Sequence, residues 1–309
     1  MRLGCKPAAS REAAGWAPGF AGSFHNSFAG GVKGGIHCPR FKCHTNAQNP
    51  LNFNAMPEPV SLYIIAYQEA ANLREVLPTV LWADEVVVVD SFSSDDTAQV
   101  CAQFGVRHVN LPFDGFGKLR NQALALLKHN WIVSIDADER STPEFVAELR
   151  ERLQSPDCAA YFVPRRNTFL GRPIRFCGWY PDYRQPQVFD RRLFRYRPDL
   201  VHEGFECSDS IGYFKNSILQ HPFPTLAVVM AKNEKYTTLM AQRYFAAGRR
   251  AGFTQLALHP VGGFVKKYFF QQGFREGAHG FLIAALHAYY TFIKYAKLWE
   301  LQQRGKPPA

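Results

Sequence analysis

The sequence lacks any long hydrophobic run. No part of its 309 residues forms an uninterrupted apolar stretch of the roughly 18 residues that a membrane-spanning helix needs. The N-terminal residues also lack the apolar core segment of a secretory signal peptide, so we expect no such peptide. Both absences favour a protein that works in the cytoplasm.

Cysteine is present but follows no paired pattern. The chain has seven cysteines, an odd number, at scattered positions, so we expect no disulfide framework and a reducing compartment. The group His37-Cys38 to Cys43-His44 has the spacing of zinc ligands. It stands in a Gly-rich segment without a second pair, and we do not expect a zinc site there.

Acidic residues are scarce towards both ends. Residues 1–55 carry six Lys or Arg and one Glu, and residues 228–309 carry 12 Lys or Arg and three Glu. The formal charge of +10 therefore flanks a central part, residues 56–227, that has 18 basic and 22 acidic residues. A basic and aromatic C-terminal part beside a slightly acidic body is more typical of contact with a membrane surface than of nucleic-acid binding.

Three regions differ in composition. Residues 1–55 are rich in Gly, Ala, Ser and Asn without periodicity, so we expect them to be disordered. Because Met56 directly precedes the first predicted strand, we also expect it to be the true start and the preceding residues to be a spurious extension. Residues 56–225 are predicted to form an α/β domain, and residues 226–309 a helical, basic and aromatic region in which Pro260 interrupts the helical pattern.

The central region alternates between two periodicities. Apolar, β-rich runs at 60–66, 85–89, 106–111 and 131–135 predict strands. Helical patterns follow each of them, the last opening at Thr142-Pro143-Glu144, a cap, a first-turn proline and an acid. This order predicts a parallel, doubly wound sheet. After residue 155 only short β-like runs follow, at 160–163, 187–189, 193–196 and 218–221.

The most informative stretch is Trp131 to Glu139, in which a buried strand ends in Asp136-Ala137-Asp138. Alternate residues share a face of a strand, so the two carboxylates converge. They repel each other unless a cation joins them, and Mg²⁺ or Mn²⁺ accepts a few carboxylate oxygens together with phosphate oxygens. The stretch predicts a metal–diphosphate site at the carboxyl edge of the sheet.

With these elements placed, the chain resembles an inverting glycosyltransferase of family 2 with the GT-A fold. The similarity covers residues 60–225, and the downstream helical part resembles the subgroup that adds sugars, such as glucose, to the lipopolysaccharide core. The resemblance implies transfer of a hexose from a nucleotide-diphosphate sugar, UDP-glucose, to a lipopolysaccharide-core or other surface-glycan acceptor with inversion. It also implies a divalent metal, Mg²⁺ or Mn²⁺.

Several motifs carry the resemblance. They are the acid after the first strand, Asp90-Ser91-Phe92-Ser93-Ser94-Asp95-Asp96-Thr97, the Gly-rich turn into Gly117-Lys118-Leu119-Arg120-Asn121, and Asp136-Ala137-Asp138-Glu139. The resemblance assigns nucleotide and substrate binding to Ala66, Tyr67, Glu69, Asp90, Lys118, Arg120, Asn121, Asp136 and Ala137. It assigns the metal to Asp138 and Asp136. The family often has Asn before the first acid, where this chain has Gln68.

An inverting transfer needs a base that takes the proton of the acceptor hydroxyl. His202-Glu203 resembles the motif of the subgroup, which implies Glu203 as the base and His202 as its partner or a diphosphate ligand. Many family members carry Glu-Asp in a helix instead, which this chain lacks. Asp182 is the alternative base.

Other interpretations remain open for several residues. Asp90 and Asp95 are also typical helix caps, Arg120 could pair with Asp114, and the arginines at 191, 192 and 195 could be solvated rather than facing phosphates or acceptor. Residues 264–301 predict either an amphipathic helix at the inner face of the membrane, contacting a lipid-linked acceptor, or a helix packed on the catalytic domain.

Three other functions compete. They are a phosphohydrolase of the haloacid-dehalogenase type, a non-catalytic nucleotide- or glycan-binding protein of the same fold, and a polyprenyl-phosphate sugar transferase. The first places its D-x-D on the first strand, whereas three predicted strands precede it here.

Overall fold

The computed structural model describes residues 58–197 and 204–305. The expectations for residues 1–55, and those for His202 and Glu203, concern residues outside these ranges.

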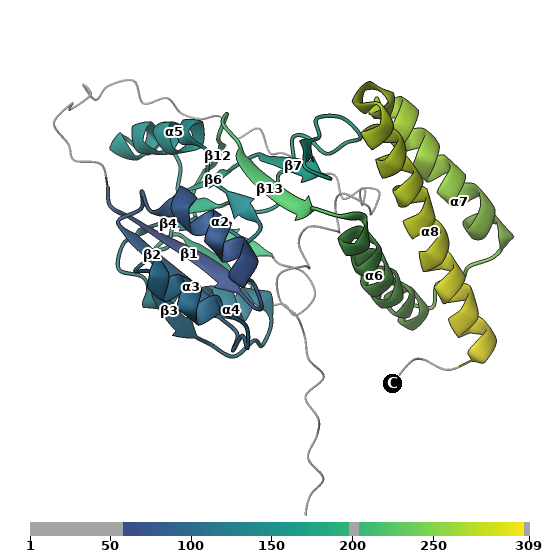
Figure 1. The fold of residues 1–309 in the computed structure, drawn as a ribbon, viewed down its shortest axis with the longest axis horizontal. Helices are drawn as coiled ribbons and strands as arrows, with labels where there is room; N and C mark the ends of the chain where they lie inside the picture. The colour runs from purple at the N-terminus through teal and green to yellow at the C-terminus, as the bar shows by residue number, and fades with distance from the viewer. Residues whose placement is uncertain (1–57, 198–203, 306–309) are drawn as a thin grey trace, which may run out of the picture.

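A mostly parallel sheet forms the centre of the first part (Figure 1). Strands β1 (Val60–Ala66), β2 (Glu85–Asp90), β3 (Arg107–Asn110) and β4 (Trp131–Ser134) are parallel and lie in the order β3-β2-β1-β4. The sheet continues through β9 (Val188–Asp190), β6 (Ala160–Phe162) and β12 (Ile211–Tyr213), in that order after β4, and within it only β9 is antiparallel to its neighbours. The predicted α/β class with a mostly parallel sheet is confirmed.

Helices cover both faces of this sheet. One apolar core joins Leu62 and Ile64 of β1 to α2 (Ala70–Val80), α3 (Thr97–Gln103) and α5 (Pro143–Gln154). The other joins Tyr63 and Ile65 to α4 (Phe116–Leu126) and to the hairpin of β10 (Phe194–Tyr196) and β11 (Phe205–Cys207). Because successive side chains of a strand point to opposite faces, one apolar strand serves two cores.

A second, smaller sheet connects the turn after β4 to the helical part. It contains β5 (Glu139–Arg140), β13 (Ile218–Phe223), β7 (Arg165–Phe169) and β8 (Arg172–Pro173) in that order. In this sheet Gln220 of β13 pairs with Glu139 of β5. The chain then passes directly into the C-terminal helices, so β13 links the turn after β4 to them.

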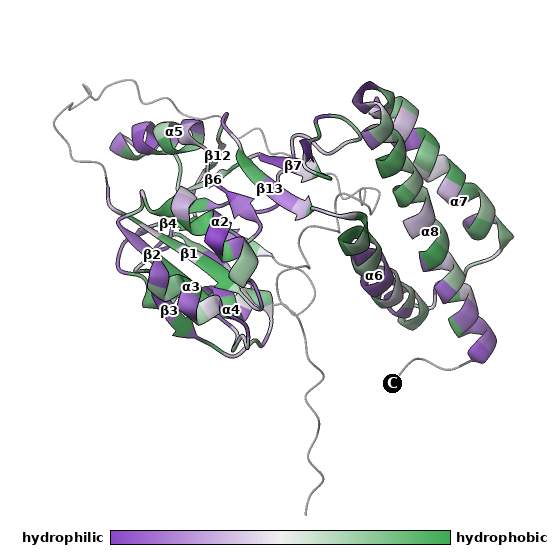
Figure 2. Ribbon diagram, viewed as in Figure 1, coloured by the Kyte–Doolittle hydropathy of each residue, from purple (hydrophilic) through white to green (hydrophobic). Residues whose placement is uncertain are grey.

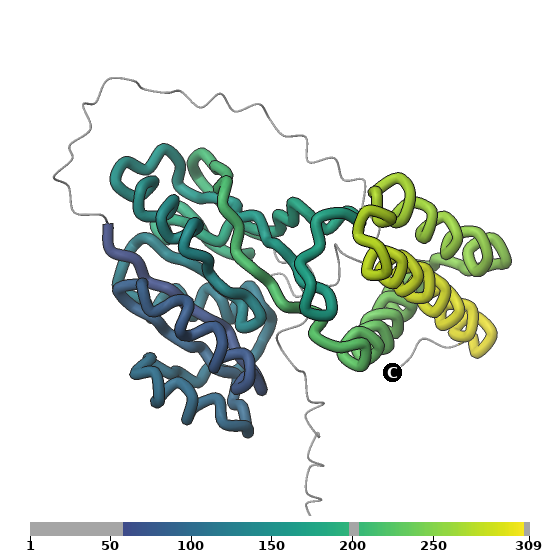
Figure 3. The backbone as a smooth tube through the Cα atoms, turned by 45° about the horizontal axis from the view of Figure 1, so that its top comes forward, coloured from purple at the N-terminus to yellow at the C-terminus, as the bar shows by residue number. Residues whose placement is uncertain are grey.

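The C-terminal part is helical, as predicted. Helices α6 (Leu226–Ala246) and α7 (Phe253–Val265) are followed by the short helices η1 (Lys266–Phe270) and η2 (Gly273–Glu276) and by the long α8 (Ala278–Arg304). Helix α8 lies between α6 and α7 (Figures 1 and 3). The predicted interruption at Pro260 is wrong, because α7 continues through this residue. Proline removes only one backbone hydrogen-bond donor, and the packing of α7 against α8 stabilises the rest of the helix.

Helix α8 packs on the α/β part. Its Ile283 and Tyr290 share an apolar core with Phe169, Trp179 and Phe223. The approach of α8 to η2 requires glycine, since a Cβ at Gly280 would lie 1.8 Å from the carbonyl oxygen of Gly273. Of the helices described, none is both long and apolar enough to cross a membrane.

The interface between α7 and α8 contains a buried histidine. His287 of α8 is 5% exposed and faces Gly263 of α7, where a Cβ would lie 3.0 Å from its ring. Burial, reinforced by the positive charges of Lys267 and Lys294, lowers the pKa of His287 from 6.5 to about 3. The folded protein therefore holds this ring neutral over a range in which the unfolded chain protonates it.

This difference predicts a pH-dependent stability. Between those two pKa values the unfolded chain binds more protons, so the contribution is complete above about pH 6.5 and is lost as the pH falls towards about 3. From about pH 7.5 to about pH 5.5 the wild type should lose about 1.4 kcal/mol more unfolding free energy than His287→Gln. Urea unfolding of both proteins measures this, and parallel pH profiles would contradict it.

Candidate active site

The turn after β4 is held by a buried glutamate. Glu139 is fully buried, and its Oε2 accepts hydrogen bonds from the backbone N–H of Asp136 and from Nε2 of Gln187, both at 2.9 Å. Its Oε1 accepts from Nε of Arg165. The backbone N–H of Glu139 returns to the carbonyl of Asp136 at 2.9 Å. The last residue of the D-A-D-E motif thus fixes the shape of the turn that carries the two aspartates.

Arg120 of α4 ties the first aspartate to the sheet. Its Nη2 donates to Oδ1 of Asp136 at 2.9 Å, and its Nη1 donates to Oγ of Ser134 at 2.8 Å. Burial alone would raise the pKa of Asp136, but the charges of Arg120 and Arg165 outweigh it and lower that pKa. The alternative pairing of Arg120 with Asp114 is wrong, since Lys118 pairs with Asp114.

The second aspartate has a different environment. Asp138 is buried, and its carboxylate accepts from Nε2 of Gln220 at 3.2 and 3.4 Å. Burial raises the pKa of Asp138, and the charge of Asp136 raises it further. A carboxylate that faces a neutral amide and a second carboxylate gains from the arrival of a cation.

The donor set fits Mg²⁺ or Mn²⁺ supplied with phosphate ligands. Asp136 bonds to Arg120 through Oδ1, and within the described part of the chain the side chain of Asp138 accepts only long hydrogen bonds from an amide. Across residues 58–197 and 204–305, no group of three or more Asp, Glu, His or Cys side chains could hold a metal by itself. Two carboxylates plus a nucleotide diphosphate match the coordination that these hard ions prefer.

The edge formed by β1 and β2 brings together further predicted residues. The Ser91 N–H donates to the carbonyl of Ala66 at 3.0 Å, which holds the two strand ends side by side. Asp90 accepts from the N–H and Oγ of Ser93 and lies 3.1 Å from Nε2 of His108. Asp90 thus organises the following loop rather than a helix end.

The start of α2 belongs to the same edge. Asp95 accepts from the N–H of Ala70 at 3.0 Å and from the N–H and Oγ1 of Thr97, so it ties the first residues of α2 and α3 together. Tyr67 is half-buried beside this point. Burial raises the pKa of Glu69 to about 7, although its bond to Asn72 opposes this.

The remaining predicted residues lie around α4 and the turn. Lys118 is exposed and Ala137 is buried. Both polar groups of the Asn121 side chain bind the backbone of Tyr196, at 2.7 and 3.1 Å. Asn121 therefore positions β10 in this structure.

Several residues at the site were not identified from the sequence. Strand β7 supplies Arg165, and the segment before β9 supplies Arg184 and Gln187. Strand β13 supplies Gln220, and α6 supplies Lys232. They contact or charge-balance the carboxylates of the turn. Along the chain they are 26 to 94 residues from the carboxylates of this turn on which they act, and no local pattern marks them.

The alternative base, Asp182, is held by Arg184 and Asn167 through one carboxylate oxygen, Oδ2. This oxygen accepts hydrogen bonds from Nε of Arg184 at 3.0 Å and from Nδ2 of Asn167 at 3.1 Å. Burial would raise the pKa of Asp182, but Arg184 and Arg165 lower it. A carboxylate with this low pKa and these partners is a poor proton acceptor.

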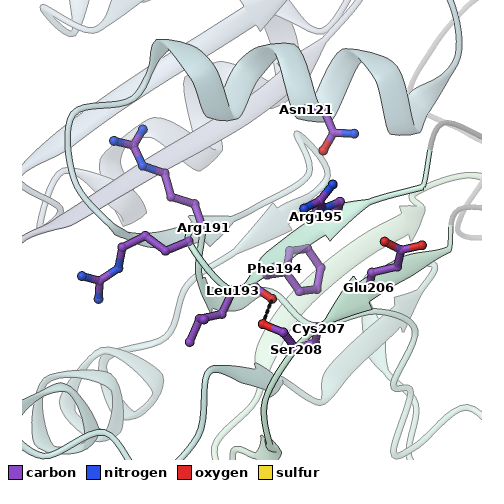
Figure 4. A pocket seen from close by; sticks show the side chains of 9 residues that line it. Asn121, Arg191, Leu193, Phe194, Arg195, Glu206, Cys207 and Ser208 are labelled. Carbon is purple, nitrogen blue, oxygen red and sulfur yellow. Dashed lines mark hydrogen bonds between the residues drawn. The ribbon is translucent and has the colours of Figure 1, made fainter.

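A separate groove of about 510 Å³ lies between α4 and the β10–β11 hairpin (Figure 4). Three arginines line it. Arg191 donates to the carbonyls of Leu124 and Leu127 at the end of α4, and Arg192 pairs with Asp190. Two of these arginines thus have structural partners.

The buried ion pair of Glu139 and Arg165 predicts a large effect on stability. Glu139→Gln removes one charge and leaves the guanidinium of Arg165 buried, which costs about 3 kcal/mol of unfolding free energy. The matched control is Glu206→Gln, whose pair with Arg197 is 55% exposed on both sides and should contribute less than about 1 kcal/mol. Denaturant unfolding compares the variants, and equal stability of Glu139→Gln and the control would refute the clamp.

Comparison with known proteins gives this geometry a family. The model for "Glycosyl transferase family 2" matches residues 61–219. The lipopolysaccharide core biosynthesis glycosyltransferase LpsC of Rhizobium meliloti is 30% identical over 258 residues, which cover 78% of this chain and 92% of that protein. An uncharacterized glycosyltransferase of Rickettsia bellii is 23% identical, covering 80% and 88%.

Solved structures match this chain as well. Residues 1–349 of S. aureus TarS give a TM-score of 0.40 with 15% identity, covering 80% of this chain and 92% of that one. Glucosyl-3-phosphoglycerate synthase from Mycobacterium tuberculosis, in complex with Mn²⁺, UDP and its product, gives 0.30 with 26% identity, covering 36% and 44%. From the family model and the similarity to LpsC together, the chain belongs to glycosyl transferase family 2, a family of enzymes with the GT-A fold.

Proposed function

We propose that the protein transfers a hexose from a nucleotide-diphosphate sugar, UDP-glucose, to a lipopolysaccharide-core or related surface glycan, with inversion and with the aid of Mg²⁺ or Mn²⁺. The observation that carries this proposal is the pair of converging carboxylates, Asp136 and Asp138, at the carboxyl edge of the sheet. The similarity to LpsC supports the acceptor class.

The donor site is proposed at that edge. Ala66, Tyr67, Glu69 and Asp90 flank the nucleotide, and Lys118 and Arg120 lie towards the diphosphate. Asp138 and Asp136 hold the metal, which when bound stabilises the negative charge that develops on the leaving diphosphate. Arg120 and Glu139 keep both carboxylates in place before the donor arrives, so little reorganisation accompanies binding.

The acceptor hydroxyl attacks the anomeric carbon from the face opposite the diphosphate. Its oxygen forms the new bond, the bond from the anomeric carbon to the phosphate oxygen breaks, and the hydroxyl proton passes to the base. We propose Glu203 for that base, with His202 beside it, because the charges of Arg184 and Arg165 lower the pKa of the alternative, Asp182, and make it a poor proton acceptor.

A transfer assay tests this function. Glu203→Gln should lower the rate of sugar transfer from UDP-glucose by about 10²-fold or more and leave UDP-glucose affinity unchanged, because only the proton acceptor is lost. Release of UDP and NMR of the new anomeric linkage are the readouts. The neighbouring Glu206→Gln serves as the control, and near-normal turnover of Glu203→Gln would place the base elsewhere.

The α7–α8 hairpin supports a peripheral contact with the inner face of the membrane. Figure 2 shows hydrophobic residues along α7 and most of α8. Large apolar side chains stay exposed on this hairpin and η1, among them Phe253, Leu258, Val261, Phe269, Phe270, Phe281, Phe292 and Trp299. Lys266 and Arg275 are exposed beside them. Aromatic anchors with nearby cations match an anionic lipid surface, which is where a lipid-linked acceptor resides.

Vesicle flotation tests this contact. The full chain should float with vesicles that contain anionic lipid. The double variant Phe253→Ser/Phe270→Ser should bind these vesicles about tenfold more weakly, because it loses two aromatic side chains that are 83% and 80% exposed. The control Leu81→Ser removes an exposed apolar side chain at the end of α2. Wild-type protein that stays at the bottom of the gradient, or equal flotation of the double variant, would reject the contact.

A further inference from the structure

Helix α6 carries a buried lysine towards the donor site. Lys232, in the second turn of α6, is 6% exposed. Its Nζ donates to the carbonyl of Pro222 at 2.7 Å and lies 5.0 Å from the centroid of the Phe223 ring. A charged group held this deep in a protein is costly unless other charges compensate for it.

Strand β13 relates this lysine to the metal edge. Gln220 of β13 donates to the carboxylate of Asp138, and the backbone N–H of His221 donates to the Asp138 carbonyl at 2.8 Å. Pro222, the next residue, holds Lys232. The charge of Lys232 acts on both Asp138 and Glu69, which come from the turn after β4 and from the start of α2.

We propose that Lys232 is a positioning residue of the donor site: its ammonium balances Asp138 and Glu69 in the free enzyme and attracts the diphosphate of the incoming nucleotide. The inference rests on the proposed metal-assisted donor site. It assigns a role in donor binding to the C-terminal helical part, whose helix α6 supplies this side chain.

A fixed positive charge has opposite effects on the two ligands. It repels a divalent cation that approaches Asp138, and it attracts a nucleotide diphosphate. Removing the charge should therefore strengthen the binding of metal alone and weaken the binding of UDP alone. A purely structural role would instead lower both affinities together or leave both unchanged.

Two substitutions isolate the charge. Lys232→Gln keeps an N–H donor for the carbonyl of Pro222 but loses the charge, whereas Lys232→Arg keeps the charge. Lys294→Met is the matched control, because Lys294 is also buried in the helical part but lies among the rings of Tyr244, Tyr290 and Tyr295. Each is made in the full chain.

The experiment measures Mn²⁺ binding without nucleotide and UDP binding in the presence of a chelator, by calorimetry. For Lys232→Gln we expect Mn²⁺ to bind about tenfold tighter and UDP about tenfold weaker. Lys232→Arg should restore UDP affinity, and Lys294→Met should match the wild type.

Three results would overturn the inference: equal affinities in Lys232→Gln and wild type, a parallel loss of both affinities, or a Lys232→Gln chain that no longer folds while Lys232→Arg also loses UDP. The measurements on the wild type distinguish a failure of this inference from a failure of the proposed function. If wild-type protein binds neither Mn²⁺ nor UDP, the donor site itself is wrong.

Discussion

The polar interior of this protein depends on one electrostatic constraint: carboxylates gathered at the end of a buried strand must be neutralised. Asp136, Asp138 and Glu139 lie within four residues of the chain. Glu69 interacts electrostatically with Asp138, and Asp182 does so with Arg165. Four cations from separate elements oppose these five carboxylates. They are Arg120 of α4, Arg165 of β7, Arg184 before β9 and Lys232 of α6. Among the residues that the structure describes, acidic side chains thus outnumber basic ones by one in this group, which suits a site that takes up a divalent cation.

This constraint gives each layer of the fold a part in the site. Helix α4 packs its apolar face on one side of the sheet and still delivers Arg120 to Asp136. The small sheet places Gln220 on Asp138 and Arg165 on Glu139. The helical part, which shares an apolar core with β7 and β13, contributes Lys232. The C-terminal helices are thus bound to the catalytic edge both by packing and by charge.

Sequence reasoning succeeded where the signal is local. The alternation of apolar runs and helical patterns predicted the strands β1 to β4, because a period of two or of 3.6 residues is set by neighbours along the chain. The D-A-D-E motif predicted the carboxylates that follow β4 for the same reason. The short strands β7, β8, β11 and β12 were not predicted, since strands of two to five residues carry little periodicity.

The partners of the site could not be predicted in this way. Arg165 looks like any surface arginine in the sequence, yet it is 2% exposed and paired with Glu139. Asn121 belongs to a motif expected to face the diphosphate, but its amide binds the backbone of Tyr196, 75 residues away. Pro260 was expected to end a helix that tertiary packing maintains. In each case, contacts between distant segments decide the outcome.

The central claim is that the edge after β4 binds a nucleotide-diphosphate sugar together with a divalent metal. Thermal unfolding with a panel of nucleotides and nucleotide sugars, each with and without Mn²⁺, tests it most directly, because a ligand that binds only the folded state raises the melting temperature. The account predicts a rise with UDP and UDP-glucose that is larger with Mn²⁺ than without it, and this metal-dependent part of the rise disappears in Asp138→Asn. No rise with any nucleotide, or a rise that is the same without metal, would contradict it.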